Sequence, residues 1–92
     1  MTSFKLNANI LRLIAEERAR QQLKWNKPHL WGWGDCSSTS VPSEIKSMVL
    51  TEECGEVARA VLELKRDDLK SELTHVAAVA IAWLESFEEK KR

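Results

Sequence analysis

Apolar residues recur at intervals of three and four along most of this chain, which is the period of an amphipathic α-helix. The pattern predicts three helices, over residues 9–25, 43–66 and 68–88. Polar residues at the start of each helix can act as N-caps, because their side chains accept hydrogen bonds from the first free backbone amides. The cap candidates, in chain order, are Asn7 or Asn9, Ser40 or Ser43, and Asp67 or Asp68. We therefore expect an all-α fold.

The apolar stripe of the first predicted helix turns polar half-way along. The stripe begins with Ile10, Leu13 and Ile14, and the same spacing continues through Glu17, Gln21, Lys24 and Trp25. One interpretation is a helix end that turns into solvent, and the sequence alone favours it. The other is a helix whose second half lines a wet pocket.

Residues 26–42 form a predicted loop between the first two helices, with both prolines and two of the three glycines of the chain. Loops of this length in a small domain are usually either functional or disordered. The loop also carries Trp31 and Trp33, which are costly to leave in solvent. We expect these rings to pack on the core, as is more common, or to stack on a ligand.

The third predicted helix is apolar around most of its circumference. A helix of this kind must be buried on nearly all sides. Two further helices from one short chain can hardly enclose it, so the pattern predicts a helical bundle that a second copy of the chain completes. We expect one domain over 1–92, with a solvated charged tail at 88–92.

Composition and charge exclude several classes of protein. Lys+Arg and Asp+Glu are both 14, so the net charge of +0 argues against binding a nucleic acid polymer. The longest apolar stretch, 76–84, is far shorter than the roughly 20 residues of a membrane span. No signal peptide is visible, and Cys36 and Cys54 therefore read as reduced thiols of a cytoplasmic protein.

Acidic residues interrupt the apolar arcs of the second and third helices. Glu53 and Glu56 share a face inside the arc of the second helix, and Glu52 lies at its edge. Glu72 falls within the apolar stripe of the third helix, and His75 follows on its flank. Isolated carboxylates rarely occupy a core, because desolvation of each ion costs several kcal/mol. Two adjacent helices that aim acids inward therefore predict a divalent cation between them, Mg²⁺ or Mn²⁺.

Simpler explanations exist for each of these residues. Glutamate pairs on helices often form solvated faces or salt bridges, here with Arg59 or Lys65. His75 alone can be a buried histidine with ordinary hydrogen bonds. The acids of both helices and their position on the apolar arcs strengthen the metal hypothesis, and the simpler explanations stay open.

Residues 50–62, LTEECGEVARAVL, resemble the EExxE motif of the MazG-like all-α nucleoside triphosphate pyrophosphatases. Residues 72–75, ELTH, stand where that family has ExxD. Residues 17–25 and 76–83 resemble small stand-alone members of the family. The resemblance extends over roughly residues 10–88.

This resemblance implies a homodimeric or homotetrameric helical bundle that hydrolyses a nucleoside triphosphate to the monophosphate and pyrophosphate, in a house-cleaning role, with Mg²⁺. It implies that Glu53, Glu56 and Glu72 are metal ligands and that Glu52 is a further ligand or orients the attacking water. His75 replaces the expected Asp, which favours Mn²⁺ over Mg²⁺ if His75 is a ligand. The same replacement leaves two alternatives open: a catalytically weakened nucleotide-binding protein or a structural helical dimer.

Residues around the first helix are candidates for substrate binding. Lys24 can balance the charge of a triphosphate, and Trp25 or Trp31 can stack on a base. Gln21 can read a base edge. Further candidate groups in the same region are Arg18, Arg20, Asn26, Lys27 and Lys46.

Overall fold

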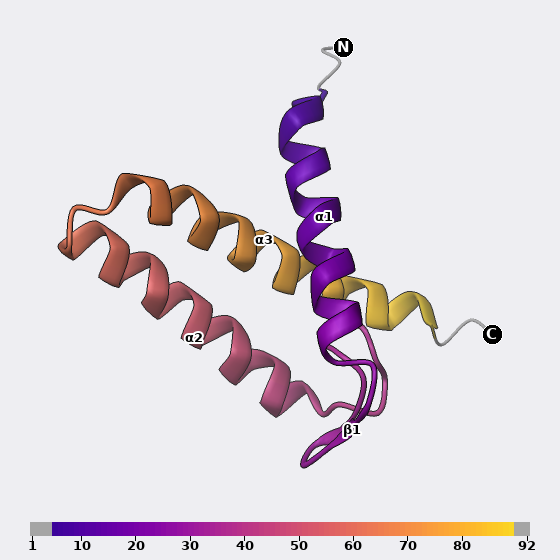
Figure 1. The fold of residues 1–92 in the computed structure, drawn as a ribbon. Helices are drawn as coiled ribbons and strands as arrows, with labels where there is room; N and C mark the ends of the chain where they lie inside the picture. Colours follow the sequence, from indigo (N-terminus) through magenta and orange to yellow (C-terminus); the bar gives the residue numbers. More distant parts are fainter. Residues whose placement is uncertain (1–4, 90–92) are drawn as a thin grey trace, which may run out of the picture.

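The computed structural model describes residues 5–89 as three α-helices and one short β-hairpin (Figure 1). The elements are α1 (Ala8–Lys24), β1 (Pro28–His29), β2 (Gly32–Trp33), α2 (Ser43–Leu62) and α3 (Arg66–Glu89). The predicted all-α class is confirmed, and every helix begins and ends within a few residues of its predicted limits. Within the described residues, no helix is both long enough and apolar enough to cross a membrane.

Helices α2 and α3 lie side by side as an antiparallel pair, and α1 crosses α3 (Figure 1). The β-hairpin lies between the end of α1 and the beginning of α2. This arrangement brings the second half of α1, the first half of α2 and the hairpin around one region of the molecule.

The helix ends correct two of the three cap predictions. Asn7 caps α1 as predicted, since its Oδ1 accepts hydrogen bonds from the amides of Asn9 at 2.8 Å and Ile10 at 3.2 Å. Pro42 occupies the N-cap of α2, with no side-chain cap bond, so the serine caps were wrong. Helix α3 begins at Arg66, so the two predicted cap aspartates lie inside its first turn. There their negative charges interact favourably with the positive end of the helix dipole.

Helix α2 ends four residues before its predicted limit because the backbone turns at Leu64. The amide of Lys65 donates to the carbonyl of Ala60 at 3.0 Å, and the amide of Leu64 donates to the carbonyl of Val61 at 3.2 Å. These are the two bonds of a Schellman motif, which requires a left-handed residue. Leu64 takes that conformation, with φ of 57°.

The predicted loop 26–42 contains a hairpin that the sequence pattern missed. Pro28 pairs with Trp33 and His29 with Gly32 in an antiparallel register. Strands of two residues are too short to show alternation in the sequence. Ser40 holds the hairpin in place, because its hydroxyl accepts from the amide of Trp33 at 2.9 Å and donates to the carbonyl of the same residue at 2.9 Å.

The core of a single copy is small. Its buried apolar residues are Val41, Ala60, Ala78, Val79 and Ala82, and no large side chain is fully buried among the described residues. Leu73, Leu84 and Phe87 of α3 are more than half exposed. Of the predicted tail, 88 and 89 belong to α3 and 90–92 lie outside the described residues.

Candidate metal centre and adjoining pocket

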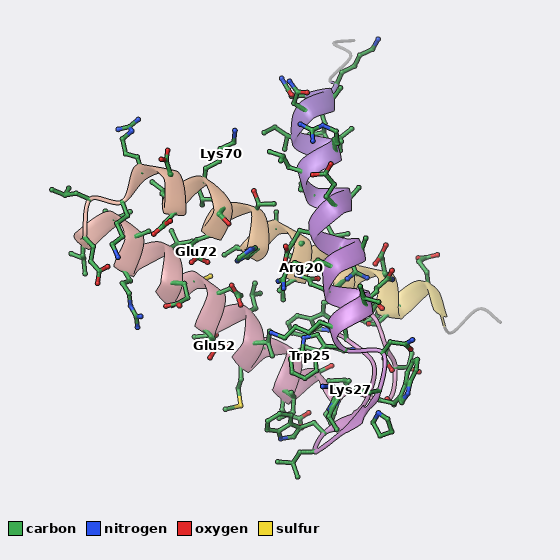
Figure 2. All side chains as sticks on the ribbon, in the orientation of Figure 1. Arg20, Trp25, Lys27, Glu52, Lys70 and Glu72 are labelled. Carbon is green, nitrogen blue, oxygen red and sulfur yellow. The ribbon has the colours of Figure 1, made fainter. Side chains whose placement is uncertain are left out.

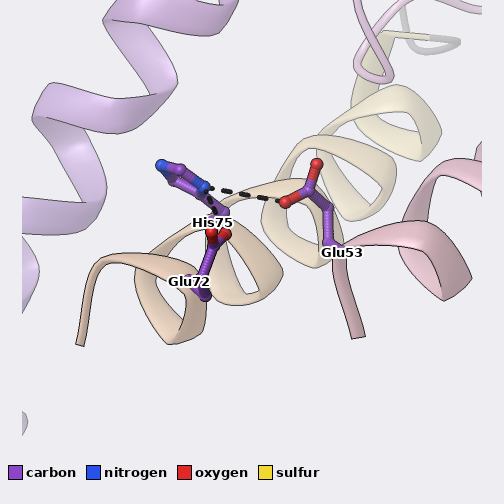
Figure 3. Close-up of side chains that lie close together, drawn as sticks. All are labelled: Glu53, Glu72 and His75. Carbon is purple, nitrogen blue, oxygen red and sulfur yellow. Dashed lines mark hydrogen bonds and ion pairs between the residues drawn. The ribbon is translucent and has the colours of Figure 1, made fainter. Parts of the chain in front are cut away.

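Three of the predicted site residues converge between α2 and α3. Glu53 projects from α2, and Glu72 and His75 project from α3 toward it (Figure 3). One ligand atom from each lies within 4.8 Å of the others. His75 Nδ1 is 3.1 Å from Glu72 Oε1 and 3.6 Å from Glu53 Oε1. The three side chains are about three-quarters buried, with exposed fractions of 24–27%.

The surroundings of Glu53 disfavour the ionised form of its carboxylate. Burial raises the pKa of Glu53 above its ordinary value, and His75 opposes that shift by lowering it. The neighbouring carboxylates of Glu72, Glu52 and Glu56 raise the pKa of Glu53 further. A cation close to Glu53 would offset both the cost of burying its charge and the repulsion from neighbouring carboxylates. This carboxylate is therefore suited to be a metal ligand.

The other two glutamates of the EExxE motif lie outside this cluster. Glu52 is exposed and lines the neighbouring pocket. Glu56 is near Arg59 of the same helix, with 3.6 Å between its Oε1 and the guanidinium. Glu52 is adjacent to Glu53 in the sequence, so it points about 100° away around α2. Glu56 shares a face with Glu53, but its carboxylate lies toward Arg59 and not among the converging ligand atoms.

Sequence reasoning did not recognise Glu17 of α1 as part of the cluster. Its carboxylate is buried, and its Oε1 lies 3.6 Å from His75 Nε2. Arg20 donates to both carboxylate oxygens, at 2.8 and 2.6 Å, and the hydrogen bond from Arg20 is the main cause that lowers the pKa of Glu17. The signal in the sequence was the polar continuation of the α1 stripe. Its interpretation as a helix end in solvent was wrong, because Glu17, Arg18 and Gln21 are all buried.

A pocket of about 550 Å³ adjoins the cluster and shares Glu53 with it. Arg20 of α1, Trp25 directly after α1 and Glu52 of α2 line it (Figure 2). All four predicted substrate residues contribute to its wall, which contains Gln21, Lys24, Trp25 and Trp31. The apolar part of the wall comes from Val41, Ile45, Met48, Val49 and Val79. The pocket therefore has an acidic end, a basic side and aromatic walls.

Aromatic rings and cations gather around Trp25 at the hairpin end of the pocket. Trp25 and His29 meet edge to face with 5.5 Å between ring centroids, and His29 and Trp31 are 6.4 Å apart. The ammonium groups of Lys24 and Lys27 lie 5.4 and 5.9 Å from the centre of the Trp25 ring. This end offers flat apolar surfaces next to positive charge.

A buried polar network connects the pocket wall to the helices. Arg18 donates to Asp35 at 2.6 Å, to Gln21 at 3.0 Å and to Glu85 at 2.7 Å. Burial alone would raise the pKa of Asp35, but hydrogen bonds from Ser37 and Arg18 outweigh it and leave the pKa below its ordinary value. The loop that carries Asp35 is thus tied to both α1 and α3.

Fold and site together define an all-α protein with a carboxylate and imidazole cluster beside a pocket of basic and aromatic groups. A family model, the MazG nucleotide pyrophosphohydrolase domain, matches residues 43–92, which is more than half of the chain. The chain therefore belongs to the MazG nucleotide pyrophosphohydrolase family. Comparison with curated proteins and with solved structures gave no match. The matched residues contain α2 and α3 and hence the whole cluster, whereas α1 and the hairpin precede them.

Proposed function

We propose that the protein hydrolyses a nucleoside triphosphate to the monophosphate and pyrophosphate, with a divalent cation held by Glu53, Glu72 and His75. The observation that carries the proposal is the convergence of these three donors at the edge of the pocket. Family membership supports the reaction class. The acidic end would meet the phosphates through the cation, and the aromatic end would receive the base.

The donor set fits a divalent cation. Carboxylate oxygens suit Mg²⁺ and Mn²⁺, and the imidazole of His75 shifts the preference toward Mn²⁺. When bound, the cation would neutralise phosphate charge and make water a better nucleophile. Glu56 pairs with Arg59, and we assign it an outer position that adds negative charge near the site.

Residues of the pocket would bind and orient the substrate. Arg20, which bonds to Glu17, places positive charge near the acidic end, and Lys24 lies over Trp25 at the hairpin end. We propose that both balance the charge of the triphosphate. Glu52 lines the pocket with an exposed carboxylate, and we propose that it orients the attacking water. Trp25 and Trp31 would stack on the base. Stacking tolerates any base, so these rings determine affinity more than base identity.

The test is pyrophosphate release from a panel of ribo- and deoxynucleoside triphosphates with Mg²⁺ or Mn²⁺. We expect release that depends on metal and is lost in Glu53→Gln. Glu63→Gln is the matched control, because Glu63 follows α2 and pairs with Lys65 at the surface. Absence of release from every nucleotide would contradict the proposal.

A second function, nucleotide binding without hydrolysis, is favoured by the position of His75. Its ring lies between the carboxylates of Glu17, Glu53 and Glu72 and is within hydrogen-bond distance of Glu72, so the imidazole itself can occupy the place of a metal between these side chains. Calorimetry that finds nucleotide affinity in the absence of turnover would support this function. Metal-dependent pyrophosphate release would reject it.

We also propose that two or more copies of the chain associate through their exposed apolar faces. Leu73, Leu84 and Phe87 lie on α3 with more than half of their surface exposed, as do Val61 and Leu62 at the end of α2. A second copy would remove these side chains from water, at roughly 25 cal/mol for each Å² of apolar surface. Light scattering coupled to size exclusion tests this and separates a dimer from a tetramer.

The cysteines support a reducing compartment. Cys36 and Cys54 are both free thiols. Free thiols persist where glutathione and thioredoxin act, so we propose a cytoplasmic location.

A further inference from the structure

We infer that Glu17 is a positioning residue that holds the ring of His75 with Nδ1 toward Glu53 and Glu72, so that Nδ1 is the ligand atom. The inference rests on the proposed metal site, but it concerns a residue of α1 that lies outside both motifs and outside the residues that the family model matches. The evidence is the set of hydrogen bonds around Glu17 and the different partners of the two nitrogens of the His75 ring.

Glu17 is held rigidly as an anion. Only 8% of its surface is exposed. Arg20 Nε donates to its Oε1 at 2.8 Å, and Arg20 Nη2 donates to its Oε2 at 2.6 Å. Gln21 Nε2 donates to the same Oε2 at 3.2 Å. With donors on both oxygens, this carboxylate has a fixed direction.

The amide of Gln21 is itself oriented by Arg18. Arg18 Nη1 donates to Gln21 Oε1 at 3.0 Å, and this contact turns the NH₂ end of the amide toward Glu17. Gln21 therefore uses both ends of its amide within the protein. Gln21 lines the pocket, but its amide is bonded to Glu17 and Arg18 and is therefore less able to form hydrogen bonds with a base edge.

The two nitrogens of His75 face different partners. Nε2 lies 3.6 Å from Glu17 Oε1. Nδ1 faces the other side, 3.1 Å from Glu72 and 3.6 Å from Glu53 (Figure 3). A neutral imidazole has one N–H and one lone pair. In this structure Nδ1 lies within hydrogen-bond distance of Glu72 Oε1, and because a carboxylate can only accept, Nδ1 is the donor of that bond. A cation at Nδ1 would need the lone pair of that atom, so the proton would have to sit on Nε2, where the anion of Glu17 at 3.6 Å would stabilise it. Histidine ligands commonly have a carboxylate in this second position, which fixes the tautomer.

The anion of Glu17 is compatible with a neutral imidazole at position 75 but not with a second anion there. An aspartate in place of His75 would face Glu17 as a second anion, and Glu17 would then repel the ligand that it now supports. The effect of removing the charge of Glu17 should therefore depend on which residue occupies position 75. A merely structural role of Glu17 would not have this dependence.

The first experiment measures Mn²⁺ affinity by calorimetry without nucleotide. We expect Glu17→Gln to weaken Mn²⁺ binding at least about tenfold, the usual lower range for loss of a carboxylate behind a histidine ligand. Glu16→Gln, on the exposed side of the same helix, is the control and should bind as the unsubstituted chain does. In the His75→Asp background, Glu17→Gln should leave affinity unchanged or increase it. Equal weakening in both backgrounds, or no weakening in the first, overturns the inference.

The second experiment reads the tautomer directly by ¹⁵N NMR of the imidazoles with diamagnetic Zn²⁺. We expect a proton on His75 Nε2 and a metal shift on Nδ1, and we expect this preference to weaken in Glu17→Gln. His29 provides an internal reference, because its Nε2 contacts the carbonyl of Gly34 at 2.7 Å. A metal shift on Nε2 of His75 overturns the inference.

The outcomes separate this inference from the proposed function. Mn²⁺ binding and pyrophosphate release with no effect of Glu17→Gln reject the role of Glu17 alone. Failure of the unsubstituted chain to bind Mn²⁺ rejects both.

Discussion

Arg18 of α1 and Asp35 of the loop before α2 form an ion pair with 2.6 Å between Nη1 and Oδ2, and each side chain is more than nine-tenths buried. The same guanidinium contacts Glu85 of α3 at 2.7 Å. One arginine thus joins the pocket loop to two helices. This connection holds the pocket wall in place beside the metal cluster.

Breaking this pair should be strongly destabilising. Arg18→Met leaves Asp35 buried without its cation, and loss of one partner of a buried pair costs roughly 3–5 kcal/mol. Arg12→Met is the control, because the Arg12 pair with Glu16 is exposed and contributes at most about 0.5 kcal/mol. Urea unfolding followed by circular dichroism measures both. A similar loss in the two variants would contradict the importance of the buried pair.

Stability should fall on acidification because of Asp35 and Glu17. The folded state holds the pKa of each below its ordinary value, Asp35 through hydrogen bonds that outweigh burial and Glu17 mainly through Arg20. Their contribution is therefore complete above the unfolded pKa and is lost as the pH falls through the folded pKa. Glu53, with its raised pKa, contributes in the opposite direction. Unfolding free energies between neutral and acid pH should depend less on pH in Asp35→Asn, and an unchanged dependence would count against this origin.

His75→Asp should increase the dependence of the protein on metal. The substitution replaces an imidazole with a further anion among Glu17, Glu53 and Glu72, so the metal-free protein should melt at a lower temperature. An all-carboxylate set suits Mg²⁺ better, so the rise in Tm on adding Mg²⁺ should be larger than in the unsubstituted chain. Thermal unfolding with and without Mg²⁺ provides the measurement. An equal Mg²⁺ effect in both proteins would argue that position 75 does not contact the cation.

The two tryptophans of the hairpin offer a matched pair of variants. Trp31 lines the pocket, whereas Trp33 on the same hairpin does not, and both are about half exposed. Stacking on a base is worth about 1–3 kcal/mol, so Trp31→Ala should weaken nucleotide binding roughly 5- to 150-fold at 25 °C. Trp33→Ala should have little effect on affinity. Nucleotide titrations of both variants decide the matter, and equal losses would place the base elsewhere.

Substitutions at Leu64 and Gly32, which both have positive φ, should change the stability of the protein in opposite directions. Leu64→Gly removes a side chain from the left-handed position and should stabilise the protein by about 1 kcal/mol. Gly32→Ala should destabilise it, because φ is +140° and a Cβ would lie 2.7 Å from the carbonyl oxygen of Ser40. Melting temperatures test both, with a shift of roughly 4–8 °C for each kcal/mol in a domain of this size. A lower Tm for Leu64→Gly would show that its side chain contributes contacts that outweigh the strain.

Periodicity along the chain was sufficient to predict the three helices, the placement of Glu53 and Glu72 on facing surfaces, and the all-α class. These features depend on local spacing, and a helix turns by a fixed angle per residue. The same regularity placed Glu56 near Glu53, but it did not show that the Glu56 carboxylate lies near Arg59, outside the group of converging ligand atoms. The end of α2 also escaped prediction, because Leu64 carries no glycine-like signal for the left-handed turn.

Only the tertiary structure decided which polar residues of α1 belong to the site. The sequence shows Glu17, Arg18 and Gln21 as a polar stretch of a helix, and such a stretch is usually solvated. The crossing of α1 over α3 buries them, brings Glu17 to His75, and joins Arg18 to Asp35. Local sequence determines helix and face because those follow from neighbouring residues. The partners of a buried charge come from distant segments, so they are determined only when the helices pack.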